Sequence, residues 1–142
     1  MRLKNRVSII TGAAQGIGAA FAEGLAKEGA KVVIADILDG RDAVKKIEDS
    51  GVEAIFVKTD VTIQDECNTM AKAAFDRFGS IDILVNNAAI FGSIVLKPFV
   101  EITTEEWNRV MNVNTGGPFH CTKAVFPYMK ERGGKIINIS SG

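Results

Sequence analysis

The sequence predicts an α/β fold: a doubly wound parallel sheet with helices on both faces. Short runs rich in valine and isoleucine alternate along the chain with segments whose apolar residues recur at helical spacing. Strands that alternate with helices build right-handed βαβ units. The strand-like runs are almost continuously apolar, which is typical of strands covered on both faces. We therefore expect a single domain spanning residues 1–142.

Five strands and four helices are expected in alternation. The predicted strands are residues 7–11, 31–36, 54–57, 81–85 and 135–139, and the predicted helices are residues 16–28, 43–50, 64–78 and 103–132. The third helix is the most strongly marked, because its apolar residues follow the i, i+3, i+4, i+7 spacing of one helical face. Thr103 and Glu106 form a capping-box pattern before the last helix. Pro118 and Pro127 are expected to bend that helix, and residues 92–98 are expected to be a surface loop.

The composition argues against several classes of protein. Lys and Arg number 17, as do Asp and Glu, so the chain lacks the positive excess typical of proteins that bind nucleic acids or membrane surfaces. No apolar run reaches the roughly 18 residues that span a bilayer, and no signal peptide is predicted, so we expect a cytoplasmic protein. Cys67 and Cys121 form no CxxC pair, and His120 is the only histidine. We therefore expect no disulfide framework and no metal site, with these side chains in the core or on a helix surface.

A glycine-rich loop joins the first predicted strand to the first helix. Its sequence, residues 11–18, is TGAAQGIG. Gly12 permits a tight turn, while Gly16 and Gly18 let backbone N–H groups approach a pyrophosphate and let the helix pack close to the sheet. The helix N-terminus adds partial positive charge. Gln15 and Ile17 complete this candidate phosphate site. A tight turn without a ligand is the alternative interpretation.

Asp36 ends the second predicted strand, 18 residues after Gly18. A carboxylate at this point can accept hydrogen bonds from both hydroxyls of the adenosine ribose and would repel a 2′-phosphate. The glycine loop contains no Arg or Lys that could neutralise such a phosphate. The pattern therefore predicts NAD rather than NADP as the cofactor. A solvated aspartate at a strand end is the alternative.

These features, with further motifs, resemble the short-chain dehydrogenase/reductase family. The match spans nearly the whole chain in the family's order and spacing, through residues 11–18, Asp60-Val61, residues 86–89, residues 112–114 and residues 137–142. The resemblance implies a seven-stranded Rossmann enzyme, a homodimer or homotetramer, that interconverts alcohols and carbonyls with a nicotinamide cofactor. Five of those strands are expected in this chain. The resemblance places Asp60 and Val61 at the adenine, Asn87 and Ala88 along the cofactor's ribose, and Asn114 and Ser141 in the catalytic set.

The sequence departs from the family pattern at one residue and in one missing segment. Ala89 stands where the family usually has glycine. The family's catalytic Tyr-x-x-x-Lys segment, which follows the serine, is absent, because the only tyrosine is Tyr128 and the residue four positions later is Arg132. We therefore expect the chain to be the first 142 residues of a longer enzyme and to show no turnover by itself.

Asn114 falls within an apolar stripe of the last predicted helix, formed by Trp107, Val110, Met111, Pro118, Cys121, Val125 and Met129. A buried amide without a partner costs about 1–3 kcal/mol, so a carbonyl, a water or a functional group should bond it. One interpretation is a structural asparagine bonded to the backbone at a kink. The resemblance implies a catalytic one, in which the asparagine holds a water that links the family's lysine to solvent.

Ser141 follows the fifth predicted strand, at the edge where open α/β sheets bind ligands. The resemblance implies that its hydroxyl bonds the substrate oxygen, whereas a serine in this position is otherwise a common turn former. The leading functional prediction is an NAD-dependent dehydrogenase that interconverts a secondary alcohol and a ketone. A truncated, non-catalytic dinucleotide-binding module is the alternative, and a Tyr-x-x-x-Lys segment downstream in the reading frame would decide between them.

Overall fold

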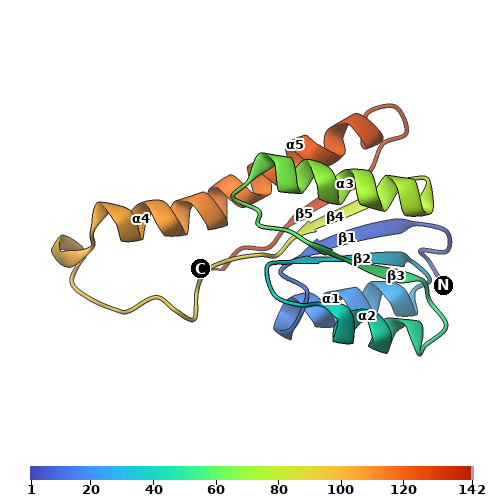
Figure 1. Cartoon of the computed structure of the whole chain (residues 1–142), viewed down its shortest axis with the longest axis horizontal. Coiled ribbons are helices and arrows are strands. Elements are labelled where there is room, and N and C mark those ends of the chain that lie inside the picture. Colours follow the sequence, from blue (N-terminus) through green and yellow to red (C-terminus); the bar gives the residue numbers. More distant parts are fainter. Residues whose placement is uncertain (142) are drawn as a thin grey trace.

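A computed structural model describes residues 1–141 of the chain. Five strands form one parallel sheet in the order β3-β2-β1-β4-β5 (Figure 1). Their bounds are β1 (Val7–Thr11), β2 (Lys31–Asp36), β3 (Ala54–Lys58), β4 (Ile83–Asn86) and β5 (Lys135–Asn138). The chain starts at β1 in the middle of the sheet. It then adds β2 and β3 on one side, and β4 and β5 on the other. The doubly wound α/β fold is therefore confirmed.

Helices cover the sheet in two layers. The helices α1 (Gly16–Lys27) and α2 (Arg41–Glu48) lie on one face, and α3 (Gln64–Phe78) and α5 (Gly117–Met129) lie on the other (Figure 1). A further helix, α4 (Thr104–Met111), extends beyond the end of the sheet. A short 3₁₀ turn, Phe99–Glu101, precedes α4. A π-helical turn, η2 (Asn112–Gly116), joins α4 to α5.

Each face of the sheet has its own apolar core. Successive side chains of a strand point to opposite faces, so Ile9 joins the core beneath α3 and α5, while Ile10 joins the core beneath α1 and α2. Helix α3 contributes four buried residues at helical spacing: Cys67, Met70, Ala71 and Ala74. The strong periodicity of this segment therefore predicted both the helix and its buried face.

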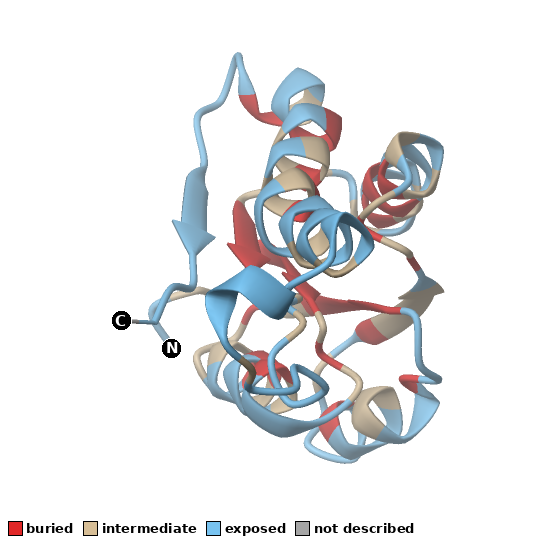
Figure 2. Ribbon diagram, turned by 90° about the vertical axis from the view of Figure 1, so that its left-hand side faces the viewer, coloured by how far each residue is buried: buried red, intermediate tan, exposed pale blue. Residues whose placement is uncertain are grey.

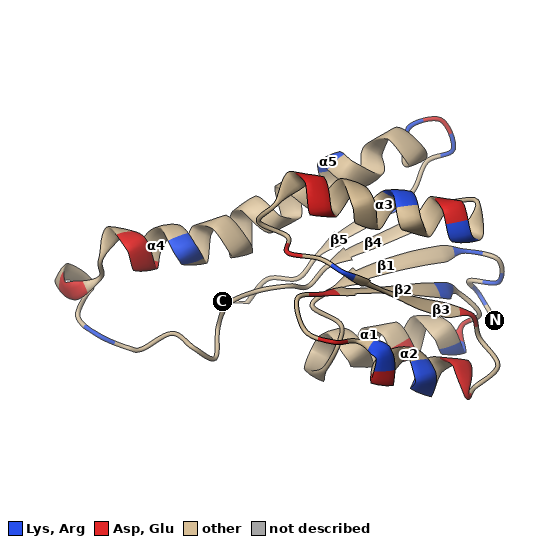
Figure 3. Cartoon of the chain, in the orientation of Figure 1, with Lys and Arg blue, Asp and Glu red and all other residues tan. Residues whose placement is uncertain are grey.

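Charged side chains of both signs are interspersed over the helices, the turns and the strand ends, while most of the sheet carries none (Figure 3). None of the helices within residues 1–141 combines the length and apolarity needed to cross a membrane.

Strand β5 is an edge strand with all four residues exposed. Figure 2 shows it along the outer margin of the described chain. The expected ends of several elements are shifted by one or two residues. The fourth strand, for example, begins at Ile83 and not at residue 81.

The predicted apolar stripe of the last helix is wrong for its first half. Cys121, Val125 and Met129 are buried as expected, but Trp107 is 59% exposed and Met111 is 38% exposed. The physical reason is position, because α4 projects past the sheet and meets no apolar layer within residues 1–141 (Figure 1). Asn114 is consequently exposed. The helical segment is also divided at η2 and not at a proline, since Pro118 lies in the first turn of α5 and Pro127 lies inside that helix.

Candidate functional site

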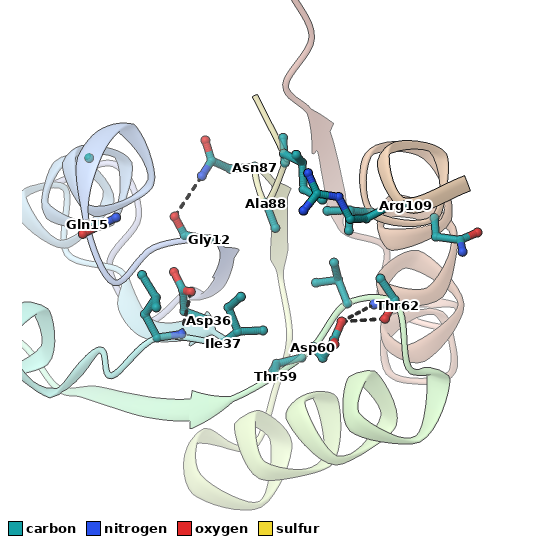
Figure 4. A pocket seen from close by; sticks show the side chains of 17 residues that line it. Gly12, Gln15, Asp36, Ile37, Thr59, Asp60, Thr62, Asn87, Ala88 and Arg109 are labelled. Atoms are coloured by element: carbon teal, nitrogen blue, oxygen red, sulfur yellow. Dashed lines mark hydrogen bonds between the residues drawn. The ribbon is translucent and has the colours of Figure 1, made fainter. Parts of the chain in front are cut away.

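A cleft of about 690 Å³ opens at the carboxyl ends of the strands (Figure 4). This edge is where open α/β sheets bind ligands. Eight of the ten predicted cofactor-binding residues line the cleft: Gly12, Gln15, Gly16, Asp36, Asp60, Val61, Asn87 and Ala88. The remaining lining residues are Ile37, Leu38, Thr59, Thr62, Ala89, Ile90, Arg109, Asn112 and Val113.

The glycine loop turns through two left-handed residues. Gly12 has φ +64° and Gly16 has φ +61°, a region that L-residues other than glycine rarely adopt. A Cβ on Gly12 would lie 2.8 Å from the Cα of Ala88, so this glycine also permits a close backbone approach. A Cβ on Gly16 would meet nothing within 4 Å. Gly16 therefore serves the conformation of the loop and faces open space.

The first turn of α1 is available to an anion. Gln15 occupies the N-cap position, but no side chain caps the helix, and the first turn contains no acidic residue. The first N–H groups of a helix have no intrahelical partner and carry partial positive charge. An uncapped helix start beside the cleft matches the needs of a phosphate group.

Gly18 and Ile17 lie outside the cleft lining. A Cβ on Gly18 would overlap the carbonyl oxygen of Gly12 and would lie 2.6 Å from Nδ2 of Asn87. Gly18 therefore acts in close packing of α1 against the loop. Ile17 is 69% exposed on the helix surface.

Asn87 and Thr11 join the end of β4 to the glycine loop. Nδ2 of Asn87 donates to the carbonyl oxygen of Thr11 at 3.0 Å and to that of Gly12 at 3.1 Å, and Figure 4 shows the second of these bonds. In return, the hydroxyl oxygen of Thr11 accepts from the backbone N–H groups of Asn87 and Ala88, each at 3.0 Å. These four bonds fix the separation of the two segments that form this end of the cleft.

Asp36 lies at the end of β2 and is 8% exposed. Its Oδ2 accepts from the N–H of Ala14 at 2.9 Å, and its Oδ1 accepts from the N–H of Leu38 at 3.0 Å. The carboxylate therefore organises the glycine loop and its own turn. Each carboxylate oxygen has a second lone pair, so Asp36 can still accept hydrogen bonds from a ligand in the cleft.

The turn after β3 forms another wall of the cleft. Oδ1 of Asp60 accepts from the backbone N–H of Thr62 at 2.9 Å and from its hydroxyl at 2.7 Å (Figure 4). The carbonyl oxygen of Val61 lies 2.9 Å from Nδ1 of His120. The Val61 side chain packs against Gly117, where a Cβ would come within 2.7 Å of it. Helix α5 thus supports this turn from behind.

The two predicted catalytic residues lie outside the cleft lining. Asn114 lies in η2, and its side-chain amide bonds both backbone groups of Ile90. Ser141 follows β5 and is exposed. Tyr128 packs against Phe75 with the ring centroids 4.9 Å apart, which identifies it as a packing residue of α5.

Sequence reasoning missed the contribution of α4 and η2 to the cleft. Arg109, Asn112 and Val113 lie three and four positions apart, on one helical face, and all three line the cleft. The sequence contains that spacing, but the predicted apolar stripe lies on the opposite side of the helix. Among residues 1–141, no cluster of three or more His, Cys, Asp or Glu side chains could hold a metal ion.

Comparisons with known proteins agree on one family. The sequence profile described as short chain dehydrogenase matches residues 6–142. Galactitol 2-dehydrogenase of Agrobacterium fabrum is 49% identical over 99% of this chain and 54% of the relative. Sorbitol dehydrogenase of Cereibacter sphaeroides is 45% identical, with coverages of 99% and 54%.

A solved structure gives the same result. A protein of Sinorhizobium meliloti 1021, assigned as a short-chain alcohol dehydrogenase, superimposes with a TM-score of 0.90 at 31% identity. The alignment covers 98% of this chain and 55% of that protein. The chain spans about half the length of the curated relatives it matches. With the glycine loop, the sheet order and the motifs in place, the chain belongs to the short-chain dehydrogenase family.

Proposed function

We propose that this chain forms the nucleotide-binding part of an NAD-dependent dehydrogenase that interconverts a secondary alcohol and a ketone. The observation that carries the proposal is the pairing of an uncapped helix start with a buried carboxylate in one cleft. The helix start suits a pyrophosphate. Asp36, on the strand beside it, suits ribose hydroxyls and opposes a 2′-phosphate.

The glycines of the loop leave space for a dinucleotide in the cleft. Gly12 leaves room at a point where a Cβ would collide with Ala88. Gly16, the first residue of α1, faces open space. In the proposed arrangement, the backbone N–H groups of the loop bind the pyrophosphate. Asp36 binds the adenosine ribose, and Asp60 and Val61 border the adenine.

The bound nicotinamide would supply hydride transfer, and the chain's own residues would bind and orient the reactants. The Ser141 hydroxyl would donate a hydrogen bond to the substrate oxygen and hold it in one orientation. Asn114 would position the segment after β4 through its bonds to Ile90. This role unites the structural and catalytic interpretations of Asn114, because a fixed loop is a condition for a fixed site.

The substrate class follows from the relatives. They include dehydrogenases named for galactitol, sorbitol and trans-4-hydroxycyclohexanecarboxylate. The first two compounds are polyols, and the third carries a hydroxyl on a ring. We therefore propose a small hydroxylated substrate oxidised at a secondary alcohol, in a protein that works in the cytoplasm as a homodimer or homotetramer.

A binding experiment tests the nucleotide site. The purified protein is titrated with NADH while the nicotinamide fluorescence is followed, and bound NADH is then displaced with ADP-ribose. The proposal predicts saturable binding and full displacement by ADP-ribose, because the adenosine and pyrophosphate halves occupy the cleft. Absence of NADH binding in a folded sample, verified by circular dichroism, would overturn the proposal.

A further inference from the structure

Arg109 is the one cationic side chain among the described residues that line the cleft. The other ionisable lining residues are Asp36 and Asp60. Both carboxylates already accept hydrogen bonds. Asp36 accepts from the backbone N–H groups of Ala14 and Leu38, and Asp60 accepts from the backbone N–H and the hydroxyl of Thr62. Neither acid uses the guanidinium, so its charge is available to a ligand.

The surroundings of Arg109 leave its donors largely free. Its guanidinium donates one hydrogen bond, to the hydroxyl of Ser93, and at 3.5 Å this bond lies at the outer limit of hydrogen-bond distance. Glu106, three positions earlier on the helix, forms an ion pair with Lys97 at 2.5 Å. Within residues 1–141, Arg109 takes part in none of the observed ion pairs. A guanidinium presents five N–H donors.

The position of Arg109 complements the glycine loop. Figure 4 shows Arg109 reaching from its helix toward Ala88, on the wall opposite Gly12 and Gln15. A pyrophosphate carries two negative charges, whereas the start of α1 offers only about half a positive charge. The loop itself contains no basic residue. A cation on the facing wall would supply the missing charge.

We propose that Arg109 is a second anchor for the cofactor, binding the pyrophosphate from the side of α4 while the glycine loop binds it from the other side. The inference rests on the proposed function, because it takes a dinucleotide as the ligand. Guanidinium is suited to this task, since its planar fork matches the oxygens of a phosphate group. No residue of α4 is buried. A ligand bound to Arg109 would therefore also hold α4 in place.

The test compares ligands with and without phosphate in matched variants. Dissociation constants for NAD, ADP-ribose and adenosine are measured by calorimetry in the unaltered protein, in Arg109→Gln and in Arg109→Lys. Arg109→Gln is expected to bind NAD and ADP-ribose about tenfold more weakly, the loss expected for one charge-assisted hydrogen bond, and to bind adenosine unchanged. Arg109→Lys should recover part of the loss. Arg132→Gln, which removes an exposed charge after α5, is the control and should bind all three ligands normally.

Salt dependence adds a second readout. Raising sodium chloride from roughly 50 to roughly 500 mM should weaken NAD binding more steeply in the unaltered protein than in Arg109→Gln, because screening acts on the contact that the variant lacks. Equal NAD affinity in the unaltered protein and Arg109→Gln would overturn the inference and leave the proposed function standing. A parallel loss of adenosine affinity would also overturn it, since that result indicates contact with the base. Failure of the unaltered protein to bind NAD or ADP-ribose would overturn both proposals.

Discussion

The side-chain amide of Asn114 forms two hydrogen bonds with the backbone of Ile90. Its Oδ1 accepts from the N–H of Ile90 at 2.7 Å, and its Nδ2 donates to the carbonyl oxygen of Ile90 at 3.0 Å. The two residues are 24 positions apart, in η2 and in the segment that follows β4. An amide side chain thus continues the backbone pairing where the sheet has ended, and it holds a wall of the cleft in place.

Replacing Asn114 by leucine should loosen this wall. We expect Asn114→Leu to lower the free energy of unfolding by about 1–2 kcal/mol, the net value of two hydrogen bonds partly replaced by water. Hydrogen exchange at the Ile90 amide, followed by NMR, should become faster. Asn108→Leu, on the exposed face of α4, is the control and should leave that exchange rate unchanged. Unchanged protection of Ile90 in Asn114→Leu would contradict the pairing.

Three glycines of one segment should respond differently to alanine. Gly18→Ala should lower the free energy of unfolding by about 3 kcal/mol or more and should disrupt nucleotide binding, because the added Cβ would overlap the glycine loop. Gly16→Ala should lower the free energy of unfolding by about 1–2 kcal/mol. A Cβ would meet no neighbouring atom, but the backbone at this position is left-handed. Gly24→Ala should stabilise α1 by about 0.5–1 kcal/mol, because this position has neither constraint.

Urea denaturation of the three variants gives the free energies of unfolding. The expected order of stability is Gly24→Ala, then the unaltered protein, then Gly16→Ala, then Gly18→Ala. A Gly18→Ala protein as stable as the unaltered one would show that α1 can shift away from the loop at little cost.

The fold was predictable because its signals are local and repeated. Buried strands appear as apolar runs, and α3 shows its buried face through the spacing of Cys67, Met70 and Ala74. The capping box of Thr103 and Glu106 is present as expected. The eight lining residues that the sequence indicated were predictable for a related reason. The glycine loop, Asp36 and Asp60 all follow strands, and the carboxyl ends of parallel strands meet at one edge.

The missed features depend on where a helix lies in space. The apolar residues of α4 look like a buried stripe, but Trp107 remains exposed because the sheet ends before it. Arg109 has the composition of an ordinary surface residue, and only the path of α4 beside the cleft gives it a role. Periodicity shows which residues share a helical face. It does not show what that face meets.

Acid should weaken the fold through Asp82. Burial acts to raise its pKa, but hydrogen bonds from the Val7 N–H, from Arg6 and from Ser80 lower the pKa below its usual value. A lowered pKa in the folded state contributes stability above about pH 4, and this contribution is lost as the pH falls through the folded-state pKa. Asp82→Asn should therefore be less stable at pH 7 by about 1–2 kcal/mol, with a shallower decline of stability in acid.

Thermal melts between pH 7 and pH 3 measure this effect. Asp49→Asn, an exposed aspartate at the end of α2, is the control and should follow the unaltered protein. Identical pH profiles for Asp82→Asn and the unaltered protein would contradict the assignment.

The two cysteines should be unreactive until the protein unfolds. Cys67 and Cys121 are both free and buried, with their sulfur atoms 3.7 Å apart between α3 and α5. The hydrogen bond with Cys67 and burial raise the pKa of the Cys121 thiol, and the thiolate is the reactive form. The same hydrogen bond lowers the pKa of the Cys67 thiol, so the protection of Cys67 rests on its complete burial. A thiol-labelling reagent should react slowly in native buffer and should label both thiols in urea. Rapid native labelling would show that this part of the core opens readily.

The most direct test of the proposed function is the cofactor preference and its dependence on Asp36. Dissociation constants for NAD and NADP are measured in the unaltered protein and in Asp36→Asn, with thermal melts to verify folding. The unaltered protein should bind NAD at least about tenfold more tightly, since a 2′-phosphate would lie against the carboxylate, and Asp36→Asn should narrow the difference. Equal or tighter binding of NADP by the unaltered protein would contradict the assignment of Asp36 and, with it, of NAD as the cofactor.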